Sequence, residues 1–448
     1  MRVCMLVSAI CVLTSAPVHA QWFETTVPAD SWPYALCYNP QNDFVYCANW
    51  GADNVTVING TTNEVAATVA VGDQPHAIIW SPLNNKVFCF NEGSQTFSVI
   101  DGATNVVVAT ESLGTHPWDV VRCPVNDRLY VLGGNPSVVV VVDCASYAVE
   151  VTIPFDFKPY GVCYDSTDNR VYVATRTDSA VHVIDCAGNV VVATIKVGPA
   201  PDKLCWNSRE NKVYTATAEG TDSTVAVIDC ASNMVVATLK PAQYPHRVSY
   251  EPTRSRVYVS CFTSAVLAVI DGASNQVVAS TPVSGWPEGS LAVPELGYVF
   301  VALGSDSVLV LDAESSQVRT SVGVGRGPFS LVYNTRDNRV YTTDFYGATV
   351  SILRASGAVE ERRSTPDASR ITPGATIVRG VLTLPRASSH KPQAASLLDA
   401  TGRKVIELNH GANDVRSLAP GIYFVRPASS VMRSASGIER MTKVIVTR

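Results

Sequence analysis

The sequence predicts an all-β chain in which one four-stranded unit recurs eight times, and three observations support this prediction. The apolar runs alternate or continue over about five to seven residues and are rich in β-branched residues, which favours strands over helices. Asp, Asn, Gly and Ser separate the runs, as turns require. A proline recurs about every 42 residues, at Pro33, Pro75, Pro117, Pro159, Pro201, Pro245, Pro287 and Pro328.

The length of this repeat indicates how the units assemble. About forty residues with four short strands is the size of one β-propeller blade. One such sheet cannot bury both of its faces alone, whereas a closed ring covers every face. We therefore expect an eight-bladed β-propeller over residues 21–355. Seven blades is the alternative, if the degenerate unit at Pro287, with its segment PELGYVF, packs irregularly.

The strands within a unit follow a fixed order. The unit that starts at Pro159 reads as strand a (GVCYD), strand b (VYVAT), strand c (AVHVID) and strand d (VVATIKV). The last unit, from Pro328, has strands a to c and then breaks into AVEERRS. The segment from Trp22 to Pro33 has the form of a strand d. We therefore expect the N-terminal segment to complete the last blade beside Ser351.

The two ends of the chain differ from the repeats. Residues 1–20 combine Arg2, an apolar stretch and the ending VHA, which predicts a secretory signal peptide. No later run reaches the length of a transmembrane helix. Residues 356–372 are rich in charge, Ser and Pro and predict a linker. Residues 373–448 again contain strand-like runs, enough for a small Ig-like β-sandwich.

Charge separates the two predicted domains. Residues 1–353 hold 19 Lys and Arg against 32 Asp and Glu, whereas residues 354–448 hold 15 against 7. An acidic propeller is a poor general binder of phosphate backbones, which need clustered cations. The acidic charge therefore disfavours nucleic acid as a partner. Single-stranded nucleic-acid binding remains a second alternative, one that predicts a strongly salt-dependent affinity.

The repeats resemble a known family of propeller repeats. The motif is VYVAT at residues 171–175, VYCAN at 45–49 and VYVSC at 257–261, followed in several units by VID and VVAT. Over residues 22–354 the units resemble the YVTN β-propeller repeats of surface-layer-like proteins. The resemblance implies a secreted or cell-surface protein that binds a ligand or another protein.

The C-terminal segment carries a second resemblance. LLDATGRKV at residues 397–405, LNHGANDV from Leu408, SLAPGIYFVR at 417–426 and KVIVTR at 443–448 occur in a distinctive order. They resemble the type A C-terminal sorting domain of the type IX secretion system. The resemblance implies passage through the periplasm and export across an outer membrane, with the secretion machinery as the partner of residues 373–448. The propeller would then be secreted or lie on the outer cell surface.

Ten cysteines lie between Cys37 and Cys261. An exported chain with an even number of cysteines invites disulfides. Equivalent positions on neighbouring blades are usually too far apart for a bond, however, and only Cys37 and Cys47 look able to pair across a hairpin. We expect most of these cysteines to be small buried apolar residues. No pair of cysteines has zinc-site spacing, so we predict no metal.

A candidate site follows from propeller geometry. The loop from strand d to the next strand a lies beside the central channel, usually on the same face as the b–c loop. Residues just after the repeat prolines should therefore form a ring of aromatic and polar groups, as small-molecule sites do. This predicted ligand site comprises Tyr34, His76, Trp118, Asp119, Tyr160, Asp202, Lys203, His246, Arg247, Glu288 and Phe329.

Catalysis is the competing hypothesis. His246 with Asp202 or Glu288 could supply a base and its orienting partner, as in a lactonase-like or quinoprotein-like propeller enzyme. Serine-nucleophile, phosphate-loop and dinucleotide motifs are absent, and no cofactor is predicted. The Asp residues that end the VID motifs fit turn caps better than calcium ligands. His182, in a strand c, is expected to be structural.

Overall fold

The computed structural model describes residues 22–217 and 223–355, together with the backbone of seven strands between residues 376 and 446. The chain divides into two compact units, Met1–Val359 and Glu360–Arg448. The predicted signal peptide (1–20) and linker (356–372) lie outside the described residues.

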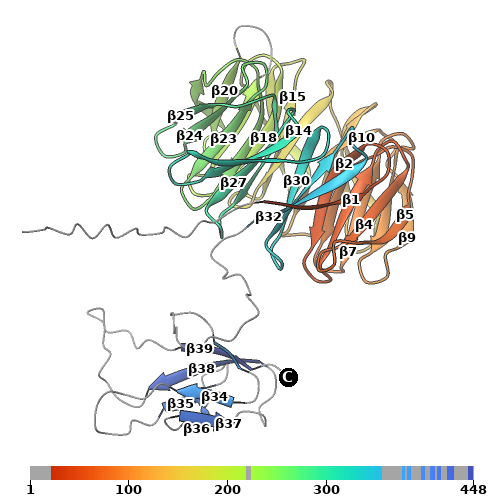
Figure 1. Cartoon of the computed structure of the whole chain (residues 1–448). Coiled ribbons are helices and arrows are strands. Elements are labelled where there is room, and N and C mark those ends of the chain that lie inside the picture. The colour runs from red at the N-terminus through yellow and green to blue at the C-terminus, as the bar shows by residue number, and fades with distance from the viewer. Residues whose placement is uncertain are drawn as a thin grey trace, which may run out of the picture. The chain divides into compact units, whose positions relative to one another are not determined.

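The first unit contains eight four-stranded antiparallel sheets (Figure 1). Blades 1 to 4 consist of β2 (Pro33–Asn39), β3 (Phe44–Asn49), β4 (Asn54–Asn59), β5 (Val65–Ala70); β6 (Pro75–Ser81), β7 (Lys86–Asn91), β8 (Thr96–Asp101), β9 (Val106–Ser112); β10 (Pro117–Cys123), β11 (Arg128–Gly134), β12 (Ser137–Asp143), β13 (Val149–Pro154); β14 (Pro159–Asp165), β15 (Arg170–Thr175), β16 (Ala180–Asp185), β17 (Val190–Lys196).

The remaining blades continue the same order. Blades 5 to 8 consist of β18 (Pro201–Asn207), β19 (Lys212–Thr217), β20 (Thr224–Asp229), β21 (Met234–Leu239); β22 (Pro245–Glu251), β23 (Arg256–Cys261), β24 (Val266–Asp271), β25 (Gln276–Pro282); β26 (Pro287–Val293), β27 (Tyr298–Leu303), β28 (Ser307–Asp312), β29 (Val318–Gly323); β30 (Pro328–Asn334), β31 (Arg339–Asp344), β32 (Thr349–Arg354) and β1 (Trp22–Pro28).

These sheets close into a ring. The innermost strands contact one another in the order β2, β6, β10, β14, β18, β22, β26, β30 and back to β2. The unit at Pro287 forms a regular sheet, β26 to β29. The eight-bladed prediction is therefore confirmed, and the seven-bladed alternative is wrong.

The last blade is completed by the N-terminal segment, as predicted. β1 pairs antiparallel with β32, and Thr26 lies opposite Ser351. Val27 is 2% exposed and joins an apolar cluster between the last and first blades. The closing strand is thereby held by backbone pairing and by burial.

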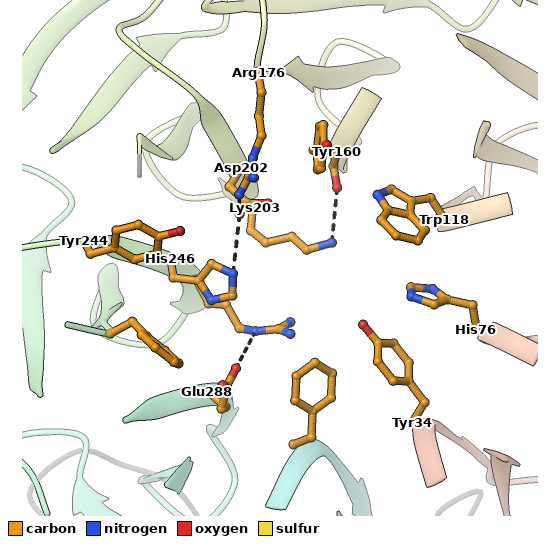
Figure 2. Close-up of a pocket in the computed structure, with 13 residues that line it drawn as sticks. Tyr34, His76, Trp118, Tyr160, Arg176, Asp202, Lys203, Tyr244, His246 and Glu288 are labelled. Carbon is orange, nitrogen blue, oxygen red and sulfur yellow. Dashed lines mark hydrogen bonds and ion pairs between the residues drawn. The ribbon is translucent and has the colours of Figure 1, made fainter. Parts of the chain in front are cut away.

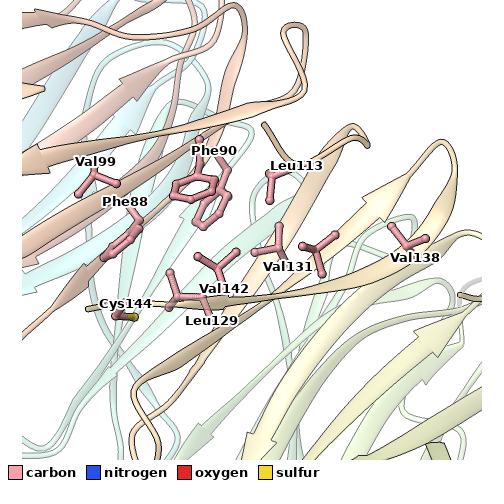
Figure 3. Packing of buried hydrophobic residues seen from close by; sticks show 12 residues of the cluster. Phe88, Phe90, Val99, Leu113, Leu129, Val131, Val138, Val142 and Cys144 are labelled. Carbon is pink, nitrogen blue, oxygen red and sulfur yellow. The ribbon is translucent and has the colours of Figure 1, made fainter. Parts of the chain in front are cut away.

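The cores lie between neighbouring blades. Phe88, Phe90 and Val99 of blade 2 pack against Leu129 and Val131 of blade 3 (Figure 3). Residues of strands b and c are buried on both faces of their sheet, because each sheet packs against a blade on either side. The continuous apolar runs of the sequence are thereby explained.

The repeated tyrosine of strand b has a second role, because its hydroxyl reaches the next blade. Tyr46 donates to Asn105 Oδ1 at 2.7 Å, and Tyr130 donates to Asn189 Oδ1 at 2.6 Å. Both asparagines lie in the left-handed region, at φ 57° and 52°, which Asn tolerates. One motif thus satisfies a buried hydroxyl and fixes the turn of the neighbouring blade.

The predicted turn caps are confirmed. Asp101 Oδ1 accepts the backbone N–H groups of Ala103 at 3.0 Å and Thr104 at 2.9 Å. Asp271 accepts the backbone N–H of Ser274 in the same way, at 2.8 Å. Each of these carboxylates therefore caps the turn that follows it.

The proposed pairing of Cys37 with Cys47 is wrong. The register places Tyr46 opposite Cys37 and Leu36 opposite Cys47, so the two thiols lie on opposite faces of the sheet. Cys37 belongs to the core with blade 2 and Cys47 to the core with blade 8. All ten cysteines of the described propeller are free and buried, as expected for most of them.

The described backbone of the second unit is also β. A five-stranded sheet has the order β33-β39-β38-β35-β36, and β34 pairs with β37. The packing of a sandwich cannot be traced, because the connecting residues lie outside the described ones. The bounds are β33 (Thr376–Val378), β34 (Val381–Leu384), β35 (Ala395–Leu398), β36 (Lys404–Leu408), β37 (Gly411–Asp414), β38 (Gly421–Pro427) and β39 (Thr442–Val446).

Among the described residues, no helix is long and apolar enough to span a membrane.

Candidate functional site at the channel mouth

The eight residues that follow the repeat prolines converge on one cavity. It measures about 370 Å³ and lies at the start of the innermost strands (Figure 2). Three residues from outside the predicted set, Arg176, Tyr244 and Phe262, complete the lining. The predicted residues that line it are Tyr34, His76, Trp118, Tyr160, Asp202, Lys203, His246, Arg247, Glu288 and Phe329.

A second chamber of about 320 Å³ continues along the inner strands and includes Asp119, the remaining predicted residue. It shares Tyr34, His76, Lys203 and Arg247 with the first cavity. All of the predicted site residues are thereby brought to the same channel.

A backbone irregularity precedes these side chains in every blade. The register between strands a and b shifts just after each repeat proline, between Pro33 and Ala35 in blade 1 and between Pro75 and Ala77 in blade 2. Such bulges turn a side chain away from the regular alternation of the strand and are frequent beside binding sites. The residue after the proline therefore turns toward the channel.

The inner strands pack so closely that a side chain at Gly161 or Gly289 would collide with the backbone of the next blade. A Cβ on Gly161 would collide with the backbone carbonyl oxygen of Asp202 on the next blade. The absence of a side chain at position 161 therefore allows the backbone of Asp202 to approach the neighbouring strand at the mouth.

Aromatic rings form one wall of the cavity. The ring centroids of Phe329 and Tyr34 lie 4.8 Å apart, and those of Tyr34 and His76 lie 4.3 Å apart. His76 stacks on Trp118 at 4.9 Å with an interplanar angle of 14°. This continuous wall presents tilted ring faces and edges on side chains that have few rotamers.

Ion pairs form the facing wall. Arg176 pairs with Asp202 at 2.5 Å, and Lys203 pairs with Asp119 at 2.6 Å. Lys203, on blade 5, thereby reaches across blade 4 to blade 3, and its ammonium also donates to the carbonyl oxygen of Tyr160 at 3.3 Å. Figure 2 shows the Lys203 side chain extending into the cavity.

Arg247 differs from these paired cations. Its Nε lies 3.6 Å from Glu288 Oε2, which is an ion pair but too long for a good hydrogen bond. The guanidinium lies over the ring of Phe329, 4.5 Å from its centroid. Both Arg247 Nε and Glu288 Oε2 are buried without a hydrogen-bond partner among the described residues.

Both histidines of the ring are neutral at pH 7. Burial, helped by the nearby charge of Lys203, lowers the pKa of His76 to about 4. Burial and the charge of Arg247 lower the pKa of His246 to about 4. The Nδ1 atom of each imidazole is buried without a hydrogen-bond partner in the described part of the chain.

The catalytic candidates meet only in part. His246 Nε2 lies 3.5 Å from Asp202 Oδ2, and that carboxylate is already bound by Arg176. An imidazole with a pKa near 4 is a weak base at neutral pH. Burial raises the pKa of Glu288, which lies beside Arg247. These three residues therefore fit an ion-pair network better than an acid–base pair.

His182 lies away from the mouth and is held by its neighbours. Its Nε2 lies 3.0 Å from Thr175 Oγ1 and 3.2 Å from Asp178 Oδ2, and Thr194 Oγ1 lies 3.2 Å from its Nδ1. The structural role predicted for it agrees with these contacts. No cluster of metal-ligating side chains occurs among the residues that the structure describes.

A side chamber was missed in the sequence. It measures about 460 Å³, adjoins the mouth through Glu288 and Phe329, and is lined by Trp286, Phe345 and Tyr346. These residues precede a repeat proline or follow a strand b. The aromatic residues that recur just before the repeat prolines and just after strand b could therefore have predicted this chamber from the sequence.

Two aromatic residues before the prolines adopt a strained backbone. Trp32 has φ 53° and Tyr244 has φ 55°, in the left-handed region that bulky residues rarely adopt. Trp32 is held there by stacking on Trp50, at 5.3 Å, and by Phe345, at 6.1 Å. Such conformations gather at binding sites, which agrees with their place on the mouth face.

Comparisons with protein-family models and with curated proteins give no match. Solved structures do resemble the chain. Sqt1 of Saccharomyces cerevisiae aligns with a TM-score of 0.64 and 12% identity over 75% of this chain and 99% of that one. The dihydro-heme d1 dehydrogenase NirN, solved in complex with DHE, aligns with a TM-score of 0.58 and 15% identity over 73% and 79%.

Hydrazine synthase of Kuenenia stuttgartiensis aligns with a TM-score of 0.51 and 18% identity, over 74% of this chain and 97% of that one. At such identities the likeness shows the fold alone. The chain is an eight-bladed β-propeller, and its site must be interpreted from its own residues.

Proposed function

We propose that the propeller is a binding module whose channel mouth takes a small molecule with a flat apolar body and one carboxylate group. The buried Nε of Arg247, which has no hydrogen-bond partner among the described residues and lies beside the aromatic wall, is the observation that carries this proposal. A cavity of about 370 Å³ with aromatic walls and a few polar groups has the form of a small-molecule site.

Arg247 selects the charge of the ligand. The other cations of the lining already bind carboxylates at hydrogen-bond distance, Arg176 with Asp202 and Lys203 with Asp119. Arg247 forms only the long ion pair with Glu288, and the fork of a guanidinium matches a carboxylate in geometry. Because the 3.6 Å separation from Glu288 is too long for a good hydrogen bond, a ligand carboxylate can bind this guanidinium in its place.

The aromatic wall selects the shape of the ligand. Tyr34, His76, Trp118 and Phe329 present ring faces and edges within one wall. His76 adds no charge, because its pKa is about 4. A planar ring stacked on this wall would place an attached carboxylate toward Arg247, and a longer ligand would extend into the side chamber beside Trp286.

We propose further that the protein acts outside the cytoplasm. The signal-like residues 1–20 and the sorting-domain motifs of residues 373–448 support export by a type IX secretion system to the surface or the medium. In a host with this system, removal of residues 373–448 should leave the propeller in the periplasm. Equal delivery of both forms to the surface or medium would contradict the export proposal.

The ligand proposal is tested with 8-anilinonaphthalene-1-sulfonate, a fluorescent aromatic anion whose sulfonate takes the place of the carboxylate. Titration of the full chain should show one saturable site. Arg247→Met should weaken binding by about tenfold or more, because a charge-assisted hydrogen bond to the anion is lost.

Arg319→Met is the matched control. Arg319 lies on the outer strand β29, forms an ion pair with Asp312 and does not line the mouth. Circular dichroism spectra must show that each variant is folded. Equal affinity of the Arg247→Met variant and the wild type would contradict the proposal, and so would an equal loss in the control.

A further inference from the structure

A recurring contact joins each blade to the next, away from the channel mouth. The last residue of strand a in one blade faces the residue that follows strand c in the next blade. Where that second residue is glycine, a Cβ there would point straight at its partner. At Gly60 it would lie 2.5 Å from Asn334 Nδ2, and at Gly102 it would lie 2.8 Å from Asn39 Nδ2.

The same positions carry other residue pairs elsewhere in the ring. Val293 and Ala355 share a core between blades 7 and 8. Ser81 is close enough to Cys144, and Asp165 close enough to Cys230, to change the pKa of the facing thiol. Between blades 3 and 4 both positions are cysteine. A side chain at one position thus contacts the side chain at the other.

The pair between blades 3 and 4 is Cys123 and Cys186. Both are fully buried in one apolar cluster. Asn169 binds both residues, since Cys123 Sγ donates to its Oδ1 at 3.3 Å and the Cys186 N–H donates to its carbonyl oxygen at 3.1 Å. The two thiols are also close enough to shift each other's pKa, that of Cys123 downward and that of Cys186 upward.

We propose that Cys123 and Cys186 form a disulfide that covalently joins blades 3 and 4 when the folding chain meets a disulfide-bearing oxidant. Cys144 and Cys230 occupy the same position in blades 3 and 5 but face a serine and an aspartate, so they have no thiol at this contact. In the cell the bond depends on the proposed export, because the cytoplasm keeps thiols reduced.

The reaction is a thiol–disulfide exchange with oxidised glutathione or a disulfide oxidoreductase. The Cys123 thiolate attacks one sulfur of the oxidant and releases the other as a thiolate. The Cys186 thiolate then attacks the Cys123 sulfur and releases the second oxidant thiolate. The protein loses two electrons, the oxidant disulfide gains them, and the two protons end on the released thiols.

Cys123 and Cys186 can exchange these two roles, because any exposed thiolate can make the first attack. Since both thiols are buried in the finished ring, the exchange is expected before blades 3 and 4 have packed together.

The test is to refold the full chain from denaturant in oxidised glutathione and to digest it with trypsin without reductant. Mass spectrometry should find residues 123–128 linked to residues 177–196, which contain Cys186. Reduction should lower the melting midpoint of the oxidised protein by about 5 °C, because the bond constrains a loop of about 60 residues in the unfolded chain.

Two variants separate this bond from a general effect of oxidation. Cys123→Ser should abolish both the linked peptides and the response of melting to reductant, whereas Cys144→Ser should keep both. If both thiols remain fully alkylatable after oxidative refolding, or if Cys123 pairs with a different cysteine, the proposal is wrong. These readouts do not depend on any ligand at the channel mouth.

Discussion

Two kinds of side chain occupy equivalent positions in every blade. Six blades carry a buried tyrosine at one position of strand b, and blades 2 and 7 carry Phe88 and Phe300 there. The hydroxyls of Tyr46 and Tyr130 bind a turn of the neighbouring blade, so packing leaves little freedom at this position. The residue after each repeat proline faces the channel, and it differs between blades, from Tyr34 to Asp202 to Phe329. Variation within the repeat therefore marks the positions that are free to serve function.

The end of strand b shows what one buried charge costs. Asn49 ends β3 and donates to Asn54 and Thr56, whereas Asp344 ends β31 and accepts from Thr349 at 2.7 Å and Ser351 at 2.8 Å. Asp344 is fully buried, and its Oδ1 has no hydrogen-bond partner among the described residues. Burial, opposed by those hydrogen bonds, raises the pKa of Asp344 from 3.8 to about 6.

Asp344→Asn should therefore stabilise the protein in a pH-dependent way. A pKa that is raised on folding means that the contribution of Asp344 to stability is present below about pH 4 and is lost as the pH rises through about 6. At pH 8 the variant should unfold with a free energy roughly 1–3 kcal/mol higher than the wild type. Denaturant titrations at pH 4.5 and pH 8 measure the difference.

The reciprocal control is Asn49→Asp, which places the same carboxyl group at the same position of blade 1. It should destabilise the protein more at pH 8 than at pH 4.5. A pH-independent effect of Asp344→Asn would show that the buried charge is not the cause.

The sequence predicted the ring residues because the proline marks their position in every unit. It did not predict Arg176, Tyr244 and Phe262, although they line the same cavity. Their contribution depends on how the b–c loop and the residue before the proline fold back, and repeat spacing does not specify this. The pairing of Arg176 with Asp202 is likewise a property of the folded loop.

Of the propeller strands, β1 lies farthest in sequence from the strand with which it pairs. It is separated from its partner β32 by almost the whole propeller sequence and pairs with it only when the ring closes. Besides backbone pairing, Glu24 of β1 binds Arg339 at 2.7 Å and Arg354 at 3.2 Å. Arg339 is nearly buried, so this contact replaces much of the water that its charge would otherwise bind.

Glu24→Gln should weaken ring closure. Burial alone would raise the pKa of Glu24, but the two guanidinium groups hold it below the ordinary value of 4.5. A lowered pKa means that the carboxylate adds stability above its unfolded pKa and loses it as the pH falls through the folded value. At pH 7 the variant should lose about 1–3 kcal/mol of unfolding free energy.

Chemical denaturation at pH 7 and at pH 3 measures this effect. The difference between the two proteins should shrink at the lower pH, because protonation of Glu24 removes the ion pair. Glu64→Gln is the matched control, because Glu64 lies exposed at the turn before β5 and forms no ion pair in the described structure. A loss in the control as large as that of Glu24→Gln would remove the argument for closure by this ion pair.

The whole propeller follows from the sequence because its period, its turn residues and its missing fourth strand all predict the same closed ring. Contacts between neighbouring blades do not follow, since they depend on the register in which two sheets pack. The wrong pairing of Cys37 with Cys47 and the unforeseen meeting of Cys123 with Cys186 are both examples. One residue of strand register decides which core each thiol enters.

Closure of the ring also creates the site. The ion pair of Lys203 with Asp119 joins blades 5 and 3, and the aromatic wall runs from blade 8 through blades 1 and 2 to blade 3. No single blade contains a binding surface of this kind. We therefore propose that only the assembled mouth binds a planar carboxylate at Arg247.

The most direct measurement is a crystal structure of the chain soaked with 6-bromo-2-naphthoate, whose bromine is located by its anomalous scattering. We expect one strong bromine peak inside the ring of channel-mouth residues. The carboxylate should lie within hydrogen-bond distance of the Arg247 guanidinium, and the naphthalene should lie against the aromatic wall of Tyr34 and Trp118. An empty mouth in crystals soaked at a saturating concentration, or a peak only on the outer surface of the blades, would contradict it.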